Sequence, residues 1–209
     1  MGCPQRTRTN LEIVLPCRYW LVNRAGKSIV LIGMMGAGKS SVGRGLQQRT
    51  GLVLRDTDEI VGQKFGTSIS EIFSKYGEKR FREAETEALH GLPVGQPGIV
   101  VTGGGIVWRE ENVDLLQRLG TVVWLEADEA TLFERASRSG KRPLLQTENP
   151  RKAFSQMLQA RRPLYAKIAD IRINTAVLTD EEVAVAILSK LRRLRRNPGP
   201  ESPIPATAR

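Results

Sequence analysis

The sequence predicts an α/β fold in which helices cover both faces of a central five-stranded parallel sheet. Two observations carry this prediction. Short apolar runs alternate with amphipathic stretches of helical length, which is the pattern of repeated βαβ units. The runs 29–32 and 122–125 are almost continuously hydrophobic, as expected for strands buried on both faces. Ligands of such sheets gather where the strands end, so side chains that follow strands are the candidates for ligand binding.

The elements can be placed in order along the chain. Strands are expected at 28–32, 52–55, 98–102, 121–125 and 171–174. Helices are expected at 39–48, 69–76, 78–90, 110–119, 129–138, 151–165 and 181–194. The alternation continues without an internal repeat, which favours one layered domain.

Length and composition fit a single domain with tails. The chain has 209 residues, 40% of them hydrophobic and 26% charged, and a core of this size needs no covalent staples. We expect a basic, flexible extension at 1–25, one domain at 26–194 and a Pro-rich, disordered tail at 195–209. Both cysteines, Cys3 and Cys17, precede the first strand, so a disulfide framework is excluded and a reducing compartment is favoured.

The formal net charge of +10 first suggests a nucleic-acid partner. Residues 1–27 hold five cationic and one anionic side chain, a net of +4, and residues 190–209 hold six and one, a net of +5. The segment between them therefore carries only +1, and we expect no nucleic-acid partner.

No apolar run approaches the ~18 residues of a membrane span, so no membrane association is expected. Segment 11–22 is interrupted by charge and proline and does not resemble a signal-peptide core. A cytoplasmic location is the expectation. An organelle transit peptide, and hence a plastid, is the less favoured alternative.

Residues 33–40 read Gly-Met-Met-Gly-Ala-Gly-Lys-Ser, directly after the first apolar run. This is the G-x-x-x-x-G-K-[ST] phosphate-binding loop in its strand-then-loop context. Glycines allow backbone N–H groups to converge on phosphates, Lys39 reaches the β/γ oxygens and Ser40 ligates Mg²⁺. A chance glycine-rich turn is a poor alternative to a nucleoside triphosphate site.

Arg55-Asp56-Thr57-Asp58-Glu59 follows the second predicted strand. In an extended segment, side chains two apart share a face, so both carboxylates would line one site. We expect Asp56 nearer a metal ion and Asp58 nearer a second substrate. The alternative is a solvated turn with an aspartate helix cap.

Weaker signals follow. Arg82 and Glu85 are three apart on a predicted helix, either as an anion-binding pair or as an ordinary surface ion pair. The triplet 103–105 is all glycine, which permits close ligand approach or a plain flexible turn.

Cationic side chains gather in the later part of the chain. One loop between two predicted helices is either a lid over phosphates or a basic surface loop, and its cations are Arg135, Arg138, Lys141 and Arg142. Arg161 ends a predicted helix, where the helix dipole also favours a cation.

Together these segments resemble the shikimate kinases, a branch of the phosphate-loop enzymes related to nucleoside-monophosphate kinases. The similarity runs in order from about residue 28 to 188. It rests on 33–40, Asp56-x-Asp58, Gly77-Glu78-x-x-Phe81-Arg82-x-x-Glu85, Gly103–Gly105, Arg142-Pro-Leu-Leu and Arg161-x-x-x-Tyr165. The resemblance implies a three-layer α/β/α phosphate-loop kinase fold with a helical substrate-binding region and a mobile lid at about 138–149. It also implies ATP-dependent phosphorylation of the 3-hydroxyl of shikimate, on the route to chorismate and aromatic amino acids.

Site roles follow from the same resemblance, position by position. It implies catalytic roles for Asp58, Lys39 and Arg142, and one Mg²⁺ ion per subunit held by Ser40 and Asp56. ATP would be bound by Gly36, Ala37, Gly38, Lys39, Ser40, Ser41, Arg135 and Arg142. Shikimate would be bound by Asp58, Arg82, Gly104 and Arg161. The lone histidine, His90, precedes a Gly-Leu-Pro turn away from these motifs, in agreement with an aspartate base.

Segment 174–180, where the family places an adenine-contacting turn, receives no assignment. A monomer with the small-molecule partners shikimate and ATP is expected. Three alternatives stay open: another small-molecule kinase of this fold, such as a gluconate or nucleotide kinase; a nucleic-acid-binding NTPase that uses the basic tails; and a catalytically inactive relative.

Overall fold

The computed structural model describes residues 27–138 and 143–196. Its strands are β1 (Ser28–Ile32), β2 (Val53–Asp56), β3 (Gly98–Val101), β4 (Gly120–Glu126) and β5 (Ile171–Asn174). Its α-helices are α2 (Lys39–Thr50), α3 (Thr57–Phe65), α4 (Ile69–His90), α5 (Glu110–Leu119), α6 (Glu129–Ser137), α7 (Pro150–Ile168) and α8 (Asp180–Arg196), with short 3₁₀ turns η1 (Ile106–Trp108) and η2 (Pro143–Leu145).

The sheet is parallel throughout, in the order β2-β3-β1-β4-β5. Val30 of β1 lies opposite Val100 on one side and Val122 on the other. Because each connection returns through a helix, every strand ends at the same edge of the sheet. The predicted five-stranded parallel sheet is confirmed.

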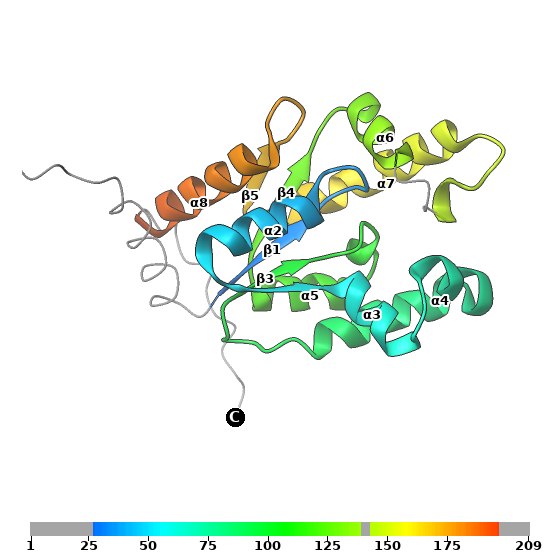
Figure 1. The fold of residues 1–209 in the computed structure, drawn as a ribbon, viewed down its shortest axis with the longest axis horizontal. Coiled ribbons are helices and arrows are strands. Elements are labelled where there is room, and N and C mark those ends of the chain that lie inside the picture. The colour runs from blue at the N-terminus through cyan, green and yellow to red at the C-terminus, as the bar shows by residue number, and fades with distance from the viewer. Residues whose placement is uncertain (1–26, 139–142, 197–209) are drawn as a thin grey trace, which may run out of the picture.

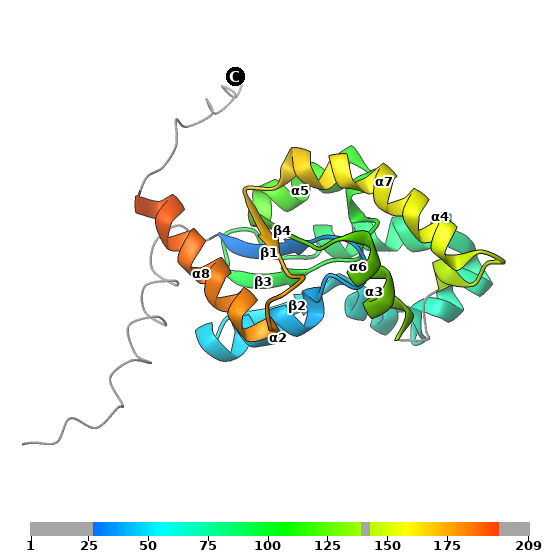
Figure 2. The same cartoon turned by 90° about the horizontal axis from the view of Figure 1, so that it is seen from above.

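Helices cover both faces of the sheet. Figure 2 shows α2 and α8 on one face and α5 and α7 on the other, with the strands between them. At the edge where the strands end, α3 packs on α4 and α6 packs on α7. The predicted α/β/α layering is confirmed, and the elements beyond that edge form the walls of a site.

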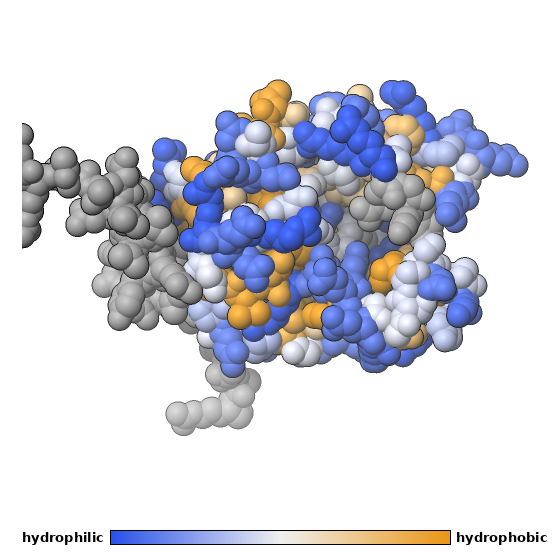
Figure 3. Space-filling view, in the orientation of Figure 1, coloured by the Kyte–Doolittle hydropathy of each residue, from blue (hydrophilic) through white to orange (hydrophobic). Residues whose placement is uncertain are grey.

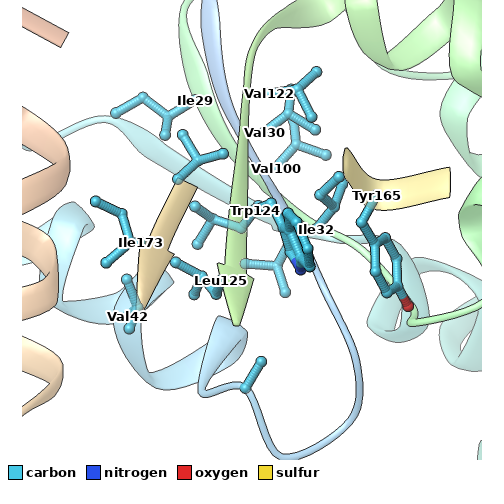
Figure 4. Close-up of a cluster of buried hydrophobic side chains, with 14 of the residues drawn as sticks. Ile29, Val30, Ile32, Val42, Val100, Val122, Trp124, Leu125, Tyr165 and Ile173 are labelled. Carbon is cyan, nitrogen blue, oxygen red and sulfur yellow. The ribbon is translucent and has the colours of Figure 1, made fainter. Parts of the chain in front are cut away.

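The core explains why the central strands carry so few polar residues. Val30, Leu31 and Ile32 of β1 are fully buried, because helices press on both faces of their strand. Figure 4 shows β-branched side chains from neighbouring strands stacked in layers, with Trp124 and Tyr165 beside them. Burying a side chain of this size contributes about 1.5–3 kcal/mol, so the packing of these side chains stabilises the sheet.

Helix α4 contains the break that the sequence predicts. Gly77 has φ 76° and ψ 171°, which is not helical, between the expected helices at 69–76 and 78–90. Upstream, Ser68 and Glu71 form a reciprocal capping box at the start of α4. Val61 of α3 packs in one cluster with Ile72 from the first half of α4 and Phe81 from the second half, so α3 contacts both sides of the break.

Two expectations at β2 are wrong: the bounds of the strand, and the extended backbone as far as Asp58. The strand covers 53–56 and not 52–55, and α3 begins at once at Thr57. Asp56 caps α3, its side chain accepting from the backbone N–H of Asp58 at 2.9 Å. The cap ends the extended backbone, so Asp58 lies in the first turn of a helix that the sequence analysis did not predict.

The surface is mostly hydrophilic on the face that Figure 3 draws, and hydrophobic side chains occur there in separate patches. Over residues 27–138 and 143–196, every helix is too short or too polar to traverse a lipid bilayer.

Candidate active site

The phosphate-binding loop leaves β1 and enters α2. Gly36 has φ 85°, and a Cβ there would lie 2.2 Å from the carbonyl oxygen of Leu132. Only glycine allows this left-handed turn against α6. Helix α2 opens after Gly38 with no side chain capping its N–H groups, so those groups can bind an anion.

Lys39 curls back over the loop. Its ammonium donates to the carbonyl of Gly33 at 2.8 Å and to that of Met34 at 3.1 Å. The neighbouring Ala37 is buried, and its N–H donates to the Met34 carbonyl at 3.2 Å. These contacts hold the loop in one shape and place a positive charge in its cradle.

Ser40 and Asp56 come together from α2 and β2. The Ser40 hydroxyl donates to Oδ2 of Asp56 at 3.3 Å. A hydroxyl and a carboxylate suit Mg²⁺, which takes one or two protein oxygens and draws its remaining ligands from phosphates and water. Across 27–138 and 143–196, His, Cys, Asp and Glu side chains form no cluster of three that could hold a metal alone.

A cavity of about 610 Å³ spreads over this loop. It is lined by Met35, Gly36, Gly38, Lys39, Ser40, Ser41, Asp56, Asp58, Val101, Thr102, Gly103, Gly104, Arg135, Leu178, Thr179 and Asp180. The predicted nucleotide residues in the described range, except the buried Ala37, therefore border one cavity.

The far wall of this cavity includes residues that sequence reasoning missed. Leu178, Thr179 and Asp180 precede and begin α8. Arg135 fixes this segment, because its guanidinium donates to the carbonyls of Thr175 at 3.0 Å and Ala176 at 3.1 Å. The resemblance points to segment 174–180 without assigning a residue there, since no local motif identifies which of its side chains line the cavity.

A second, narrower cavity of about 80 Å³ adjoins the first. Its lining is Met35, Asp58, Ile69, Phe73, Phe81, Arg82, Glu85, Gly103, Gly104, Gly105, Leu144 and Arg161. Met35, Asp58, Gly103 and Gly104 border both cavities. Asp58 thus stands where the contents of the two would meet.

The second cavity has two arginines and one buried acid. Arg82 donates to Oε2 of Glu85 at 2.5 Å and to Glu78 at 2.8 Å. The Glu85 side chain has no exposed surface, so the interpretation of this pair as an ordinary surface ion pair is wrong. The pair aligns the Arg82 fork along the cavity wall.

Burial changes the ionisation of this pair. Desolvation raises the pKa of Glu85 to about 7, against the attraction of Arg82. Desolvation lowers the pKa of Arg82, but the charges and hydrogen bonds of Glu85 and Glu78 outweigh it and the pKa is raised overall. Arg82 therefore stays charged while Glu85 titrates near neutral pH.

Arg161 approaches the same cavity from α7. It is 3% exposed, and desolvation followed by the positive charge of Arg82 lowers its pKa. Two guanidinium groups that face one cavity repel each other until an anion lies between them. The alternative role for Arg161, a surface cation at a helix end, does not fit its burial.

The glycine triplet is a close-packed wall and not a flexible turn. A Cβ on Gly103 would lie 2.4 Å from Oε1 of Glu85 and 2.8 Å from Oδ1 of Asp58. The backbone must be bare here for the two carboxylates to reach their positions.

Arg142 and Lys141 lie outside the described residues, as does the rest of segment 139–142 of the predicted lid. Of the lid, η2 is described, and its Leu144 borders the second cavity. Arg138 forms an exposed ion pair with Glu134 and lines neither cavity.

The chain matches a family model described as shikimate kinase over residues 35–192. A shikimate kinase from Thermodesulfovibrio yellowstonii is 45% identical over 168 residues, covering 80% of this chain and 96% of that protein. The structure of shikimate kinase from Acinetobacter baumannii in complex with shikimate has a TM-score of 0.78 and 35% identity, covering 82% of this chain and 96% of that one. A gluconokinase from Sinorhizobium meliloti, at 22% identity and a TM-score of 0.52, shares the fold alone.

Proposed function

The chain belongs to the shikimate kinase family, and we propose how its two adjoining cavities divide the family's reaction between them. The chain catalyses the ATP-dependent phosphorylation of the 3-hydroxyl of shikimate, a step of aromatic amino-acid biosynthesis. The larger cavity would take ATP and the narrower one shikimate.

The nucleotide half rests on the loop at the start of α2. The backbone of Gly36, Ala37 and Gly38 and the first turn of α2 with Ser41 would hold the phosphates, with Lys39 on the β/γ oxygens. Arg135 would lie beside the base, because it is tied to the segment before α8 that walls the same cavity. Arg142 would close over the phosphates as part of a mobile lid at about 138–149.

Ser40 and Asp56 would hold a single Mg²⁺ ion per subunit, Ser40 through its hydroxyl oxygen and Asp56 through its carboxylate. When bound, the ion would neutralise charge on the β- and γ-phosphates. The support is the 3.3 Å contact between Ser40 Oγ and Asp56 Oδ2 at the cavity that also contains Lys39.

The shikimate half would be held at its carboxylate by Arg82, Arg161 and the Gly104 backbone. The anion would relieve the repulsion between the two guanidinium groups, and each fork can meet a carboxylate in two parallel hydrogen bonds. Asp58, which lines the same cavity, would bind the hydroxyls.

Transfer then needs little more than alignment and charge neutralisation. Asp58 would accept the proton of the 3-hydroxyl as that oxygen bonds to the γ-phosphorus of ATP and the bond to the β-phosphate oxygen breaks. ADP leaves with its β-phosphate charge stabilised by Lys39 and Arg142. The position of Asp58 on both cavities carries this assignment.

We further propose a single domain at 26–194 that acts as a monomer in the cytoplasm, with basic tails outside it and no nucleic-acid partner. The near-neutral charge of residues 28–189 supports the absence of a nucleic-acid partner for this domain.

An acceptor panel tests the function. ADP release would be followed with ATP, Mg²⁺ and, in turn, shikimate, gluconate and nucleoside monophosphates. Among these acceptors, we expect rapid turnover only with shikimate. Turnover with another acceptor and none with shikimate would refute the assignment.

A further inference from the structure

Tyr165 lies at the meeting point of α7, the sheet and the glycine wall. Its side chain has no exposed surface. The ring packs beside Trp124 with centroids 5.9 Å apart, and Figure 4 shows the hydroxyl directed away from the strand side chains. That hydroxyl donates to the carbonyl of Gly104.

Arg161 lies one helical turn earlier on α7 and reaches the same glycine, since a Cβ on Gly104 would lie 3.5 Å from its Nη1. Desolvation raises the pKa of Tyr165 to about 12, while the charge of Arg161 and a hydrogen bond with its side chain act in the opposite direction. The phenol therefore keeps its proton at neutral pH. A hydroxyl can donate once and accept at its lone pairs, so it can serve Gly104 and Arg161 together.

Arg161 has few other fixed contacts. Its Nη1 lies 3.8 Å from the sulfur of Met34, and its guanidinium carbon lies 5.9 Å from the centroid of the Trp108 ring. Among the residues that the structure describes, Nε has no hydrogen-bond partner and no carboxylate forms an ion pair with the side chain. Arg82, in contrast, is held by two glutamates.

We propose that Tyr165 is a positioning residue for the shikimate carboxylate. Its hydroxyl joins the Arg161 guanidinium to the Gly104 backbone, so that both groups meet the anion in a fixed relative position. This inference rests on the proposed function, because it requires the carboxylate to bind at Arg161 and Gly104.

Tyr165→Phe removes the hydroxyl and keeps the ring against Trp124. We expect the KM for shikimate to rise about tenfold or more, the loss typical of a hydrogen bond to a charged group. The KM for ATP should stay within about twofold, because neither Tyr165 nor Arg161 lines the larger cavity. Tyr76→Phe is the matched control: it removes a phenol hydroxyl from an exposed position on α4, and both KM values should be unchanged.

Shikimate methyl ester separates this inference from the proposed function. Wild-type enzyme should prefer the acid strongly, and Tyr165→Phe should reduce that preference by the factor by which it raises the KM for the acid. A strong preference that Tyr165→Phe leaves intact would overturn the role of Tyr165 alone. Equal use of acid and ester by the wild type would overturn the carboxylate site at Arg161, and the role of Tyr165 with it.

A double-mutant cycle with Arg161→Lys provides a second measurement. If Tyr165 acts through Arg161, Tyr165→Phe should add little to the KM for shikimate in the R161K background. Fully additive effects would contradict the inference, as would a parallel fall of kcat and stability without a change in either KM.

Discussion

Arg82 and Glu85 form an ion pair of 2.5 Å in which the carboxylate is fully buried. A pair of this kind costs desolvation energy, and removing one partner leaves the other charge uncompensated. Its position on the narrower cavity, with a second arginine facing it, explains why the fold retains it. The pair sets the geometry of an anion site.

Arg82→Met should therefore impair shikimate binding selectively. We expect the KM for shikimate to rise about 10- to 100-fold, as for loss of a hydrogen bond to a charged group, with the KM for ATP little changed. Steady-state kinetics with each substrate varied in turn would measure both. The matched control is Arg80→Met, two residues earlier on α4, where the guanidinium pairs with Glu83 and Glu87 on the surface. An equal effect of the two substitutions would contradict the assignment of Arg82.

Glu85 should make stability depend on pH. Its folded pKa is raised from 4.5 to about 7, so between these values the native state binds a proton that the unfolded chain has released. Raising the pH from 5 to 8 therefore lowers the free energy of unfolding, by up to about 3 kcal/mol from this group. Glu85→Gln removes this contribution.

Thermal unfolding of both proteins without substrates, at pH 5 and pH 8, would measure this effect. The difference in melting temperature, Glu85→Gln minus wild type, should become more positive from pH 5 to pH 8. The expected change is about 2–4 °C for each kcal/mol of stability that the wild type loses. Glu83→Gln serves as the control for loss of a carboxylate on the same helix. An offset between Glu85→Gln and wild type that is the same at both pH values would show that Glu85 does not titrate in this range.

Gly103→Ala should damage the site, whereas the same substitution at Gly45 on α2 should not. The added methyl would lie 2.4 Å from Glu85 Oε1 and 2.8 Å from Asp58 Oδ1, so both carboxylates must move. We expect a loss of about 1–3 kcal/mol in stability together with a fall in kcat. Gly45→Ala is the control, since its methyl would meet nothing closer than 3.7 Å and should stabilise α2 by about 0.5–1 kcal/mol. Denaturant unfolding and kcat would be measured for each, and normal kinetics in Gly103→Ala would contradict this account of the wall.

Asp56→Asn should change the metal requirement. An amide in place of the carboxylate removes the negative charge that would attract Mg²⁺, so the Mg²⁺ concentration for half-maximal rate should rise by about tenfold or more. The measurement is initial rate against Mg²⁺ at fixed ATP. An unchanged Mg²⁺ profile would show that Asp56 acts only as the cap of α3.

The sheet was predictable because its signals are local. The runs at 28–32 and 171–174 match β1 and β5 residue for residue. β1 is buried along its whole length and is hydrophobic from Ile29 to Ile32, whereas β5 at the sheet edge alternates buried isoleucines with exposed polar residues. The phosphate loop is equally local, because glycine positions and Lys39 follow from one turn of backbone.

The features that could not be predicted from the sequence depend on long-range contacts or on a side-chain cap. Asp56 ends β2 by capping α3, and an Asp-x-Asp pattern fits a strand end and a helix start equally well. The wall formed by Leu178, Thr179 and Asp180, and the tie from Tyr165 to Gly104, join segments that no motif connects. The burial of Glu85 depends on packing that a helical i, i+3 spacing cannot report.

Asp58 borders both cavities, and the most direct test of the account is the kcat of Asp58→Asn at saturating shikimate and ATP. Titration calorimetry would first establish that both ligands still bind and give the concentrations that saturate the variant. We predict a fall in kcat of about 10²- to 10⁴-fold, the usual contribution of a general base. A kcat near that of the wild type would contradict the placement of Asp58 between the two substrates.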